Sequence, residues 1–274
     1  MENGNGLPAK QWEAYVNDRR ATVRAVLGPA DNLIVLVVTD LTGDLNRVEA
    51  LRAALPEALG KLGPRHYVGV LSAQDGLRAL LDPTPDRQAA VDQVQNLAVG
   101  GKSGLLDSIE AAAELADGML RKAAVRVAVL YLTDASITNY RTDYTNPVIN
   151  TSDRTDLSRR FPDRLIHDRI EQLSRALESR QAPISILQLE NRGGPLEEAY
   201  QNGLKKLAEE TGAEAVSCRT PAEVGPALEN ILARIRNVYV LSLDPPAKAR
   251  RSLRIRLGAA GVERVSYRSR LAVR

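Results

Sequence analysis

The sequence has few of the residues that carry the chemistry of many small proteins. It contains one cysteine, Cys218, which excludes an internal disulfide and any metal centre built from clustered thiolates. Aromatic residues make up only 4% of the chain, so a hydrophobic core must be built from aliphatic side chains. No run approaches the roughly 20 apolar residues of a membrane span. Residues 1–6 are polar with no apolar segment behind them, which predicts no secretory signal and favours a cytoplasmic location.

Positive charge is concentrated near the C-terminal end. Residues 248–274 hold nine Lys or Arg and one acidic residue, whereas residues 1–247 hold 28 basic and 33 acidic residues. Arg254 and Arg256 alternate with aliphatic residues, as in a strand with one face in solvent. Two interpretations stay open: a solvated sheet edge that resists aggregation, or a surface for an acidic partner or a nucleic acid. A nucleic acid is the less favoured partner, because Tyr267 is the lone aromatic residue among these arginines.

The strongest strand signal is the apolar run of residues 33–38, which is typical of a strand buried on both faces of a parallel sheet. Strands and amphipathic helices then alternate. This alternation predicts a Rossmann-like, doubly wound, mostly parallel α/β sheet covered by helices on both faces. The expected strands are 33–39, 67–73, 77–81 (antiparallel), 125–133, 184–189 and 214–218, and the expected helices are 45–62, 86–97, 105–121, 163–180, 195–211 and 221–236.

The two ends of the chain break this alternation. The apolar residues of 9–27 have a rough helical spacing, which predicts a leading helix in residues 1–29, before an α/β domain of residues 30–236. The last part, residues 237–274, predicts a β extension. Its expected strands follow one another without helices and should form a meander, at 238–243, 252–257 and 262–271.

Oxygen-bearing side chains follow two of the buried strands. Asp40, Thr42 and Asp44 come after the first strand, Asp134 comes after strand 125–133, and Ser103 lies in a glycine-rich loop before a helix. Ligands of open α/β sheets bind beyond the C-terminal ends of the strands, and such oxygens suit Mg²⁺, Mn²⁺ or Ca²⁺. The alternative is that the two carboxylates of this first group only cap the following helix.

These residues resemble the motifs of von Willebrand factor type A (VWA) domains. Residues 40–44 (Asp-Leu-Thr-Gly-Asp) are similar to the family's Asp-x-Ser-x-Ser. Residues 101–104 (Gly-Lys-Ser-Gly) lie where the family has a metal-binding threonine, and residues 133–135 (Thr-Asp-Ala) are similar to its Thr-Asp-Gly. The C-terminal strands, with residues 266–268 (Ser-Tyr-Arg), also resemble the VWA-related domains that are frequent in acidobacteria.

The resemblance implies a metal-ion-dependent adhesion site and a non-enzymatic, protein-binding function. The ion would be Mg²⁺, Mn²⁺ or Ca²⁺, and an acidic side chain of a protein partner would complete its coordination. Asp44 stands in place of a serine; a third carboxylate would hold the ion more firmly and weaken its attraction for an acidic ligand. The resemblance also favours export rather than a cytoplasmic location. The implied metal ligands are Asp40, Thr42, Asp44, Ser103 and Asp134.

A long polar stretch without periodicity occupies residues 136–162. Loops of this length are usually functional or disordered. Because it follows strand 125–133, it should leave the sheet at the same edge as the expected metal ligands. We expect it to supply partner specificity through Tyr140, Arg141, Asp143, Tyr144 and Asn146.

Other functions have weaker support. Residues 101–103 could end the phosphate-binding loop of an NTPase, but Asn96 stands where the first glycine is required and the preceding segment predicts a helix. The sequence has no Gly-x-Ser-x-Gly elbow, and His66 and His167 have no nucleophile near them in the sequence, which argues against a hydrolase. The main alternative is a metal-free VWA scaffold that binds through its loops or its basic tail.

Overall fold

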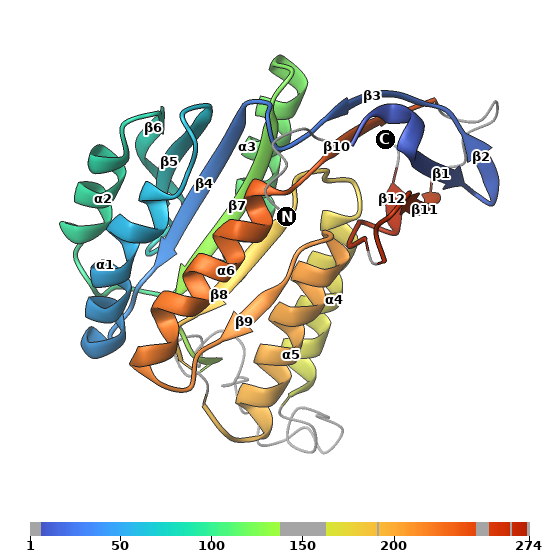
Figure 1. Cartoon of the computed structure of the whole chain (residues 1–274). Coiled ribbons are helices and arrows are strands. Elements are labelled where there is room, and N and C mark those ends of the chain that lie inside the picture. Colours follow the sequence, from blue (N-terminus) through green and yellow to red (C-terminus); the bar gives the residue numbers. More distant parts are fainter. Residues whose placement is uncertain (1–6, 138–162, 191, 245–251, 264, 273–274) are drawn as a thin grey trace, which may run out of the picture.

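The computed structural model describes residues 7–137, 163–190, 192–244, 252–263 and 265–272. Its centre is a six-stranded sheet with the order β6-β5-β4-β7-β8-β9 (Figure 1). Neighbouring strands pair in parallel except at β6, which runs antiparallel to β5. This confirms the predicted Rossmann-like sheet, including its antiparallel edge. The strands are β4 (Leu33–Asp40), β5 (His66–Ser72), β6 (Arg78–Thr84), β7 (Arg126–Thr133), β8 (Ile184–Gln188) and β9 (Ala215–Ser217).

Helices cover both faces of this sheet. One face carries α1 (Leu45–Gly60), α2 (Arg87–Gln95) and α6 (Val224–Arg236), and the other carries α3 (Leu105–Lys122), α4 (Arg164–Leu177) and α5 (Pro195–Glu210). In β4, Val35 and Val37 belong to the hydrophobic core beneath α1, α2 and α6, while Leu36 and Val38 belong to the core beneath α3, α4 and α5. The central strand is therefore apolar on both faces, as its sequence predicts. No helix within the described ranges is long and apolar enough to cross a membrane.

The N-terminal segment consists of strands, so the predicted leading helix is wrong. In β1, Trp12, Ala14 and Val16 are buried and alternate with less buried residues, which is the period of a strand. Asn17 and Asp18 both have positive φ, 50° and 62°, and close a tight hairpin of the type that needs two such residues. The elements are η1 (Ala9–Gln11), β1 (Trp12–Val16), β2 (Arg19–Ala21) and β3 (Val23–Leu27).

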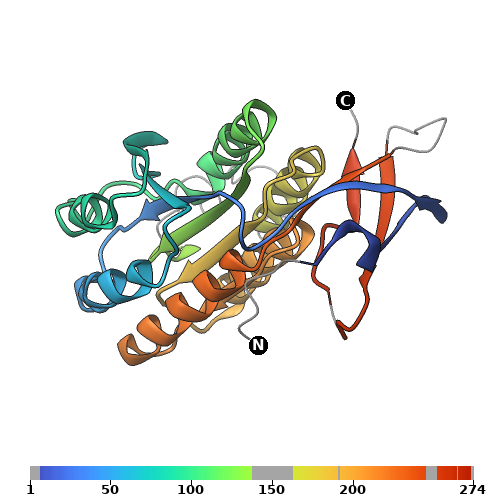
Figure 2. The same ribbon diagram turned by 45° about the horizontal axis from the view of Figure 1, so that its top comes forward.

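The C-terminal strands pair with these N-terminal strands, so the predicted meander is correct only for its last two strands, which pair with each other, and wrong for its first. β10 (Val240–Leu243) pairs with β3 in an antiparallel ribbon, which we call the β3–β10 ribbon. β11 (Ser252–Ala259) lies between β1 and β12 (Arg270–Ala272) in a sheet with the order β12-β11-β1-β2. This terminal sheet lies beside the α/β layers (Figure 2). The strand predicted at 262–271 is reduced to the three residues of β12.

The buried side chain of Arg126 connects the central sheet to the β3–β10 ribbon. Its Nη1 donates to the carbonyl oxygens of Arg236 (2.8 Å) and Val238 (3.0 Å), between α6 and β10. Its Nη2 donates to the carbonyls of Pro29 (3.1 Å) and Asp31 (2.8 Å), between β3 and β4. The side chain is fully buried. One guanidinium at the start of β7 thus holds both chain segments that leave the α/β layers for the ribbon.

Arg126→Met should destabilise the folded protein by about 3 kcal/mol or more, because it leaves several buried carbonyls without a donor. The measurement is urea unfolding followed by circular dichroism. Arg65→Met is the matched control, since Arg65 donates to a single carbonyl, that of Ala30, in an exposed position. Equal losses for the two variants would contradict a special role of Arg126.

Candidate metal centre at the ends of β4 and β7

The carboxylate of Asp40, the last residue of β4, is fully buried. Its Oδ1 accepts a hydrogen bond from the backbone N–H of Gly104 (3.0 Å), and its Oδ2 accepts one from that of Leu105 (3.2 Å). The hydroxyl of Thr133, at the end of β7, donates to the same Oδ2 at 3.4 Å. Asp40 therefore caps the N-terminus of α3. The helix cap considered from the sequence was that of α1, the next helix in the chain.

Gly104 allows this approach because it lies directly against the turn between β5 and β6. A Cβ at this position would lie 1.8 Å from the carbonyl oxygen of Ala73, a distance that no side chain can adopt. The glycine therefore brings the first N–H groups of α3 within reach of β4. This explains in steric terms why a glycine follows Ser103.

Asp134, directly after β7, holds the turn that follows β4. Its Oδ1 accepts from the backbone N–H of Thr42 (2.5 Å) and from the Thr42 hydroxyl (3.1 Å). Its Oδ2 accepts from the N–H groups of Gly43 (2.8 Å) and Asp44 (2.7 Å). Asp134 is buried, whereas Gly43 is exposed to solvent. One carboxylate thus fixes three successive residues of the predicted motif.

Ser103 is buried, yet its hydroxyl oxygen has no hydrogen-bond partner among the described residues. It directly precedes Gly104, whose N–H binds Asp40. A buried hydroxyl without a partner is unfavourable, since it has lost its water and gained nothing in return. A hydroxyl whose role is to bind a ligand would show the same lack of a protein partner.

Asp44, the third predicted carboxylate ligand, is engaged elsewhere. Its Oδ1 accepts from the N–H of Arg47 (3.2 Å), as the N-cap of α1, and its Oδ2 lies 2.9 Å from Nε of Arg47. Arg47 also donates to the carbonyl of Leu189 and to those of Cys218 and Arg219. For Asp44 the geometry matches the capping interpretation. The contacts of Arg47 give it a structural role that sequence reasoning missed, although its spacing of three from Asp44 on a helix was visible.

The donor set at this edge suits a hard cation. Asp40, Thr42, Ser103 and Asp134 supply two carboxylates and two hydroxyls, the oxygens that Mg²⁺, Mn²⁺ and Ca²⁺ prefer. The unpartnered hydroxyl of Ser103 fits such an ion. However, within the described ranges no three His, Cys, Asp or Glu side chains are close enough to hold a metal together. A cation here would be bound by two carboxylates, not by the three that the sequence predicts.

The overall structure is similar to solved VWA domains. A von Willebrand factor type A protein from Catenulispora acidiphila has a TM-score of 0.52 at 15% identity, over 86% of this chain and 52% of that one. The PilB minor pilin from Streptococcus sanguinis has a TM-score of 0.50 at 14% identity, over 75% and 61%. The vWF domain of the type V pili tip protein Mfa5 from Porphyromonas gingivalis has 0.50 at 13%, over 75% and 95%. This chain has a VWA fold.

At these identities the similarity shows the fold alone. The chain spans 52% of the Catenulispora structure and 61% of the PilB structure, so each likeness covers part of a longer protein. No protein-family model matches the sequence, and the search of curated proteins gives no match. The assignment of the VWA fold thus rests on the arrangement of strands and helices.

The partner-binding residues predicted in the loop of this VWA fold lie outside the described residues. They are Tyr140, Arg141, Asp143, Tyr144 and Asn146. The loop starts with two residues that are described, Ser136 and Ile137, and both are buried. The N–H of Ile137 donates to Oε2 of Glu197, at the start of α5. The first turn of the loop is therefore anchored between β7 and α5, at the edge that carries Asp134.

The geometry of the glycine-rich loop does not support a P-loop. The segment before it contains α2, not a strand. The N–H groups of Gly104 and Leu105 bind Asp40, and that of Lys102 binds Asp75 (2.9 Å). Carboxylates thus take the donors that a phosphate would need.

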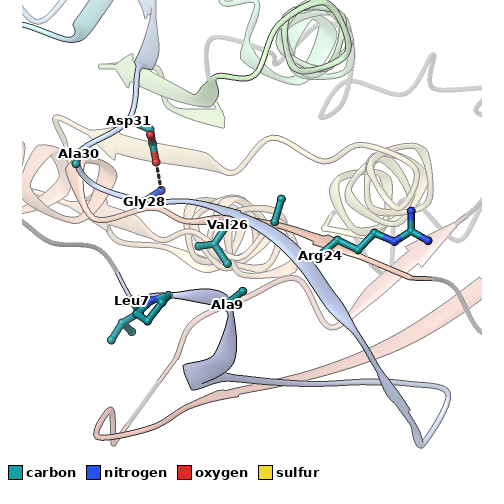
Figure 3. A pocket seen from close by; sticks show the side chains of 9 residues that line it. Leu7, Ala9, Arg24, Val26, Gly28, Ala30 and Asp31 are labelled. Carbon is teal, nitrogen blue, oxygen red and sulfur yellow. Dashed lines mark hydrogen bonds between the residues drawn. The ribbon is translucent and has the colours of Figure 1, made fainter.

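A hollow of about 390 Å³ lies at the opposite end of β4 (Figure 3). Leu7 and Ala9 face Val26 of β3 across it. Asp31 closes the turn into β4 by accepting a hydrogen bond from the N–H of Gly28 at 2.8 Å. This hollow is separate from the candidate metal centre, because β4 begins beside it and ends at Asp40.

The stability of the metal-free protein should fall as the pH rises through the titration of Asp40. Burial raises the pKa of Asp40 to about 6, hydrogen bonds from Gly104 and Leu105 oppose the rise, and the charge of Asp134 adds to it. The folded protein therefore holds this proton more tightly than the unfolded chain, where the pKa is about 3.9. The free energy of unfolding should lose on the order of 3 kcal/mol between about pH 4 and pH 7 from this group.

The measurement compares urea unfolding of the natural protein and Asp40→Asn across this pH range, in EDTA. The variant lacks the titrating carboxyl, so the difference between the two curves isolates Asp40 from other groups. The natural protein should lose stability relative to the variant as the pH rises. Parallel curves would contradict the raised pKa.

Proposed function

We propose that this VWA domain is a non-enzymatic protein-binding module that uses a divalent cation at the ends of β4 and β7. The observation that carries the proposal is the buried, unpartnered hydroxyl of Ser103 beside the buried carboxylate of Asp40. In a metal-free protein this arrangement is unfavourable on both counts, because the hydroxyl lacks a partner and the carboxylate is desolvated. A bound cation would relieve both.

Four side chains would hold the ion: Asp40, Thr42, Ser103 and Asp134. The cation would be Mg²⁺, with Mn²⁺ or Ca²⁺ as alternatives, and it would supply an electrophilic centre for an oxygen ligand of the partner. The exposed Gly43 lies next to Thr42, so the turn of residues 42–44 is where this cluster reaches solvent. Asp44 would act indirectly, through its N–H bond to Asp134 and its cap on α1.

The partner would be a protein that offers an acidic side chain to the ion, with the loop of residues 136–162 adding specificity. Two proteins of similar fold are the PilB minor pilin and the pili tip protein Mfa5. These neighbours support a role in interaction. With two carboxylates at the site, and Asp44 bound to Arg47, the site with a divalent ion would be formally neutral, without the excess negative charge of a third carboxylate that would repel such a ligand.

Ser103→Ala should remove the response to metal without harming the metal-free fold. In the natural protein, Mg²⁺ at about 100 times its dissociation constant should add roughly 2.7 kcal/mol, or about 5 to 10 °C in melting temperature. The Ser103→Ala variant should lose most of this shift while being at least as stable as the natural protein in EDTA, because it removes a buried hydroxyl that has no partner. The measurement is thermal unfolding of EDTA-stripped protein titrated with Mg²⁺, Mn²⁺ and Ca²⁺.

Ser108→Ala, on the helix that follows Ser103, is the matched control. The Ser108 hydroxyl lies 3.0 Å from that of Tyr131 in the core, so its loss should cost about 1 kcal/mol or more in EDTA. Its metal response should remain that of the natural protein. If no ion shifts the melting temperature of the natural protein, the metal-dependent proposal fails and the metal-free scaffold becomes the better description.

A further inference from the structure

The terminal sheet presents four arginines on one face. Tyr15 of β1 lies opposite Arg20 of β2 and Arg256 of β11, and residues paired in this way share a face. Arg254 is two residues from Arg256 on the same strand and lies opposite Arg270 of β12. We call Arg20, Arg254, Arg256 and Arg270 the arginine face; all four are exposed.

The other side of the terminal sheet is apolar. Trp12, Ala14, Val16 and Leu253 are buried there. The orientation of this sheet is therefore set by burial, and the arginines are held outward by the strand period. The arginine face is a fixed surface built from four strands.

Within the part of the chain that the structure describes, the charges of this face are not balanced by ion pairs. Among the described residues, none of the four arginines forms a salt bridge with an acidic side chain, whereas elsewhere Arg24, for example, pairs with Asp244. Arg254 and Arg270 are directly opposite each other, and like charges in that position destabilise a sheet. Two acidic residues belong to the same part of the sheet, Glu13 on β1 and Asp18 in the hairpin turn. The free protein thus carries an unfavourable arrangement that an anion would relieve.

The face is also hollowed. A depression of about 420 Å³ is lined by Tyr15, Asp18, Arg254, Ile255, Arg256, Tyr267, Ser269 and Arg270. The guanidinium of Arg256 lies over the Tyr15 ring, 4.6 Å from its centre, which limits the movement of that side chain. Two arginines that face each other and a third held by an aromatic ring therefore surround one concave surface.

We propose that the arginine face binds an extended acidic segment of a partner protein, with Asp or Glu at alternate positions. Arg254 and Arg256 are two residues apart on a strand, about 7 Å, and alternate side chains of an extended peptide repeat at the same distance. Arginine forks bind carboxylates with two hydrogen bonds. This surface is distinct from the candidate metal centre, and the two would bind separate partner segments.

A single-stranded nucleic acid fits the face less well. Such ligands need aromatic rings on which bases stack, and Arg256 covers one face of the Tyr15 ring. A long polyanion would also extend beyond the face toward the rest of a chain whose residues 1–247 are net acidic. A short acidic segment avoids both problems.

The test uses the full chain and a fluorescein-labelled peptide that alternates Glu and Thr, followed by fluorescence anisotropy. The double variant R254Q/R270Q should weaken binding at least about tenfold, because both opposed charges are lost. The control R121Q/K122Q removes the same charge from exposed positions at the end of α3 and should change affinity less than about twofold. In the absence of peptide, R254Q/R270Q should melt at the same temperature as the natural protein or higher, because a repulsion is removed.

Three outcomes would overturn the proposal. The first is no binding of the alternating peptide, or equal weakening by both double variants. The second is tighter binding of a dT oligonucleotide or of phosphatidylserine vesicles through the same arginines, which would assign the face to another class of partner. The third is a clear loss of melting temperature in R254Q/R270Q, which would make the two arginines structural.

Discussion

The arrangement of the whole chain depends on one buried guanidinium. Arg126 is fully buried at the start of β7, where an unpaired charge would be prohibitive. Burial lowers the pKa of Arg126, and the charge of Asp31 opposes this. Four carbonyls from two crossing segments solvate its Nη groups in place of water. The terminal strands are thereby attached to the α/β layers by polar contacts that only an arginine of this length and planarity can make.

A second set of buried polar contacts, made by two carboxylates, lies at the other end of β4. Asp40 and Asp134 are buried at adjacent strand ends, and each accepts hydrogen bonds from the loop of a different helix. The same carboxylates that would bind a cation therefore shape the loops around it. The turn of residues 42–44 and the N-terminus of α3 are ordered before any ion arrives, which reduces the entropic cost of binding.

The central sheet could be predicted because its signals are local. β4 and α3 are defined by apolar runs and periodicity within a few residues, and the VWA motifs place Asp40, Ser103 and Asp134 near one another. The N-terminal strands could not be found in this way, since Trp12 pairs with Ala259 far along the chain. The turn signal available in the sequence there was the pair Asn17 and Asp18, since Asn and Asp favour turns and tolerate the positive φ that both adopt.

The site shows the same division between local and distant information. The capping of α1 by Asp44 is local and was one of the interpretations open from the sequence. The hydrogen bonds from Arg47 to the carbonyls of Leu189 and Cys218 are not local, because they depend on how β8 and β9 end beside α1.

The pairing of β1 with β11 also has a consequence for the order of folding. During synthesis, β1 must wait for about 240 further residues, on the order of 10 to 50 seconds at typical ribosomal rates. Throughout that interval the edge of β1 that later pairs with β11 is open, and the Trp12 ring lacks its later neighbour Tyr239. The N-terminal strands are therefore the segment most in need of protection from aggregation while the chain is being made.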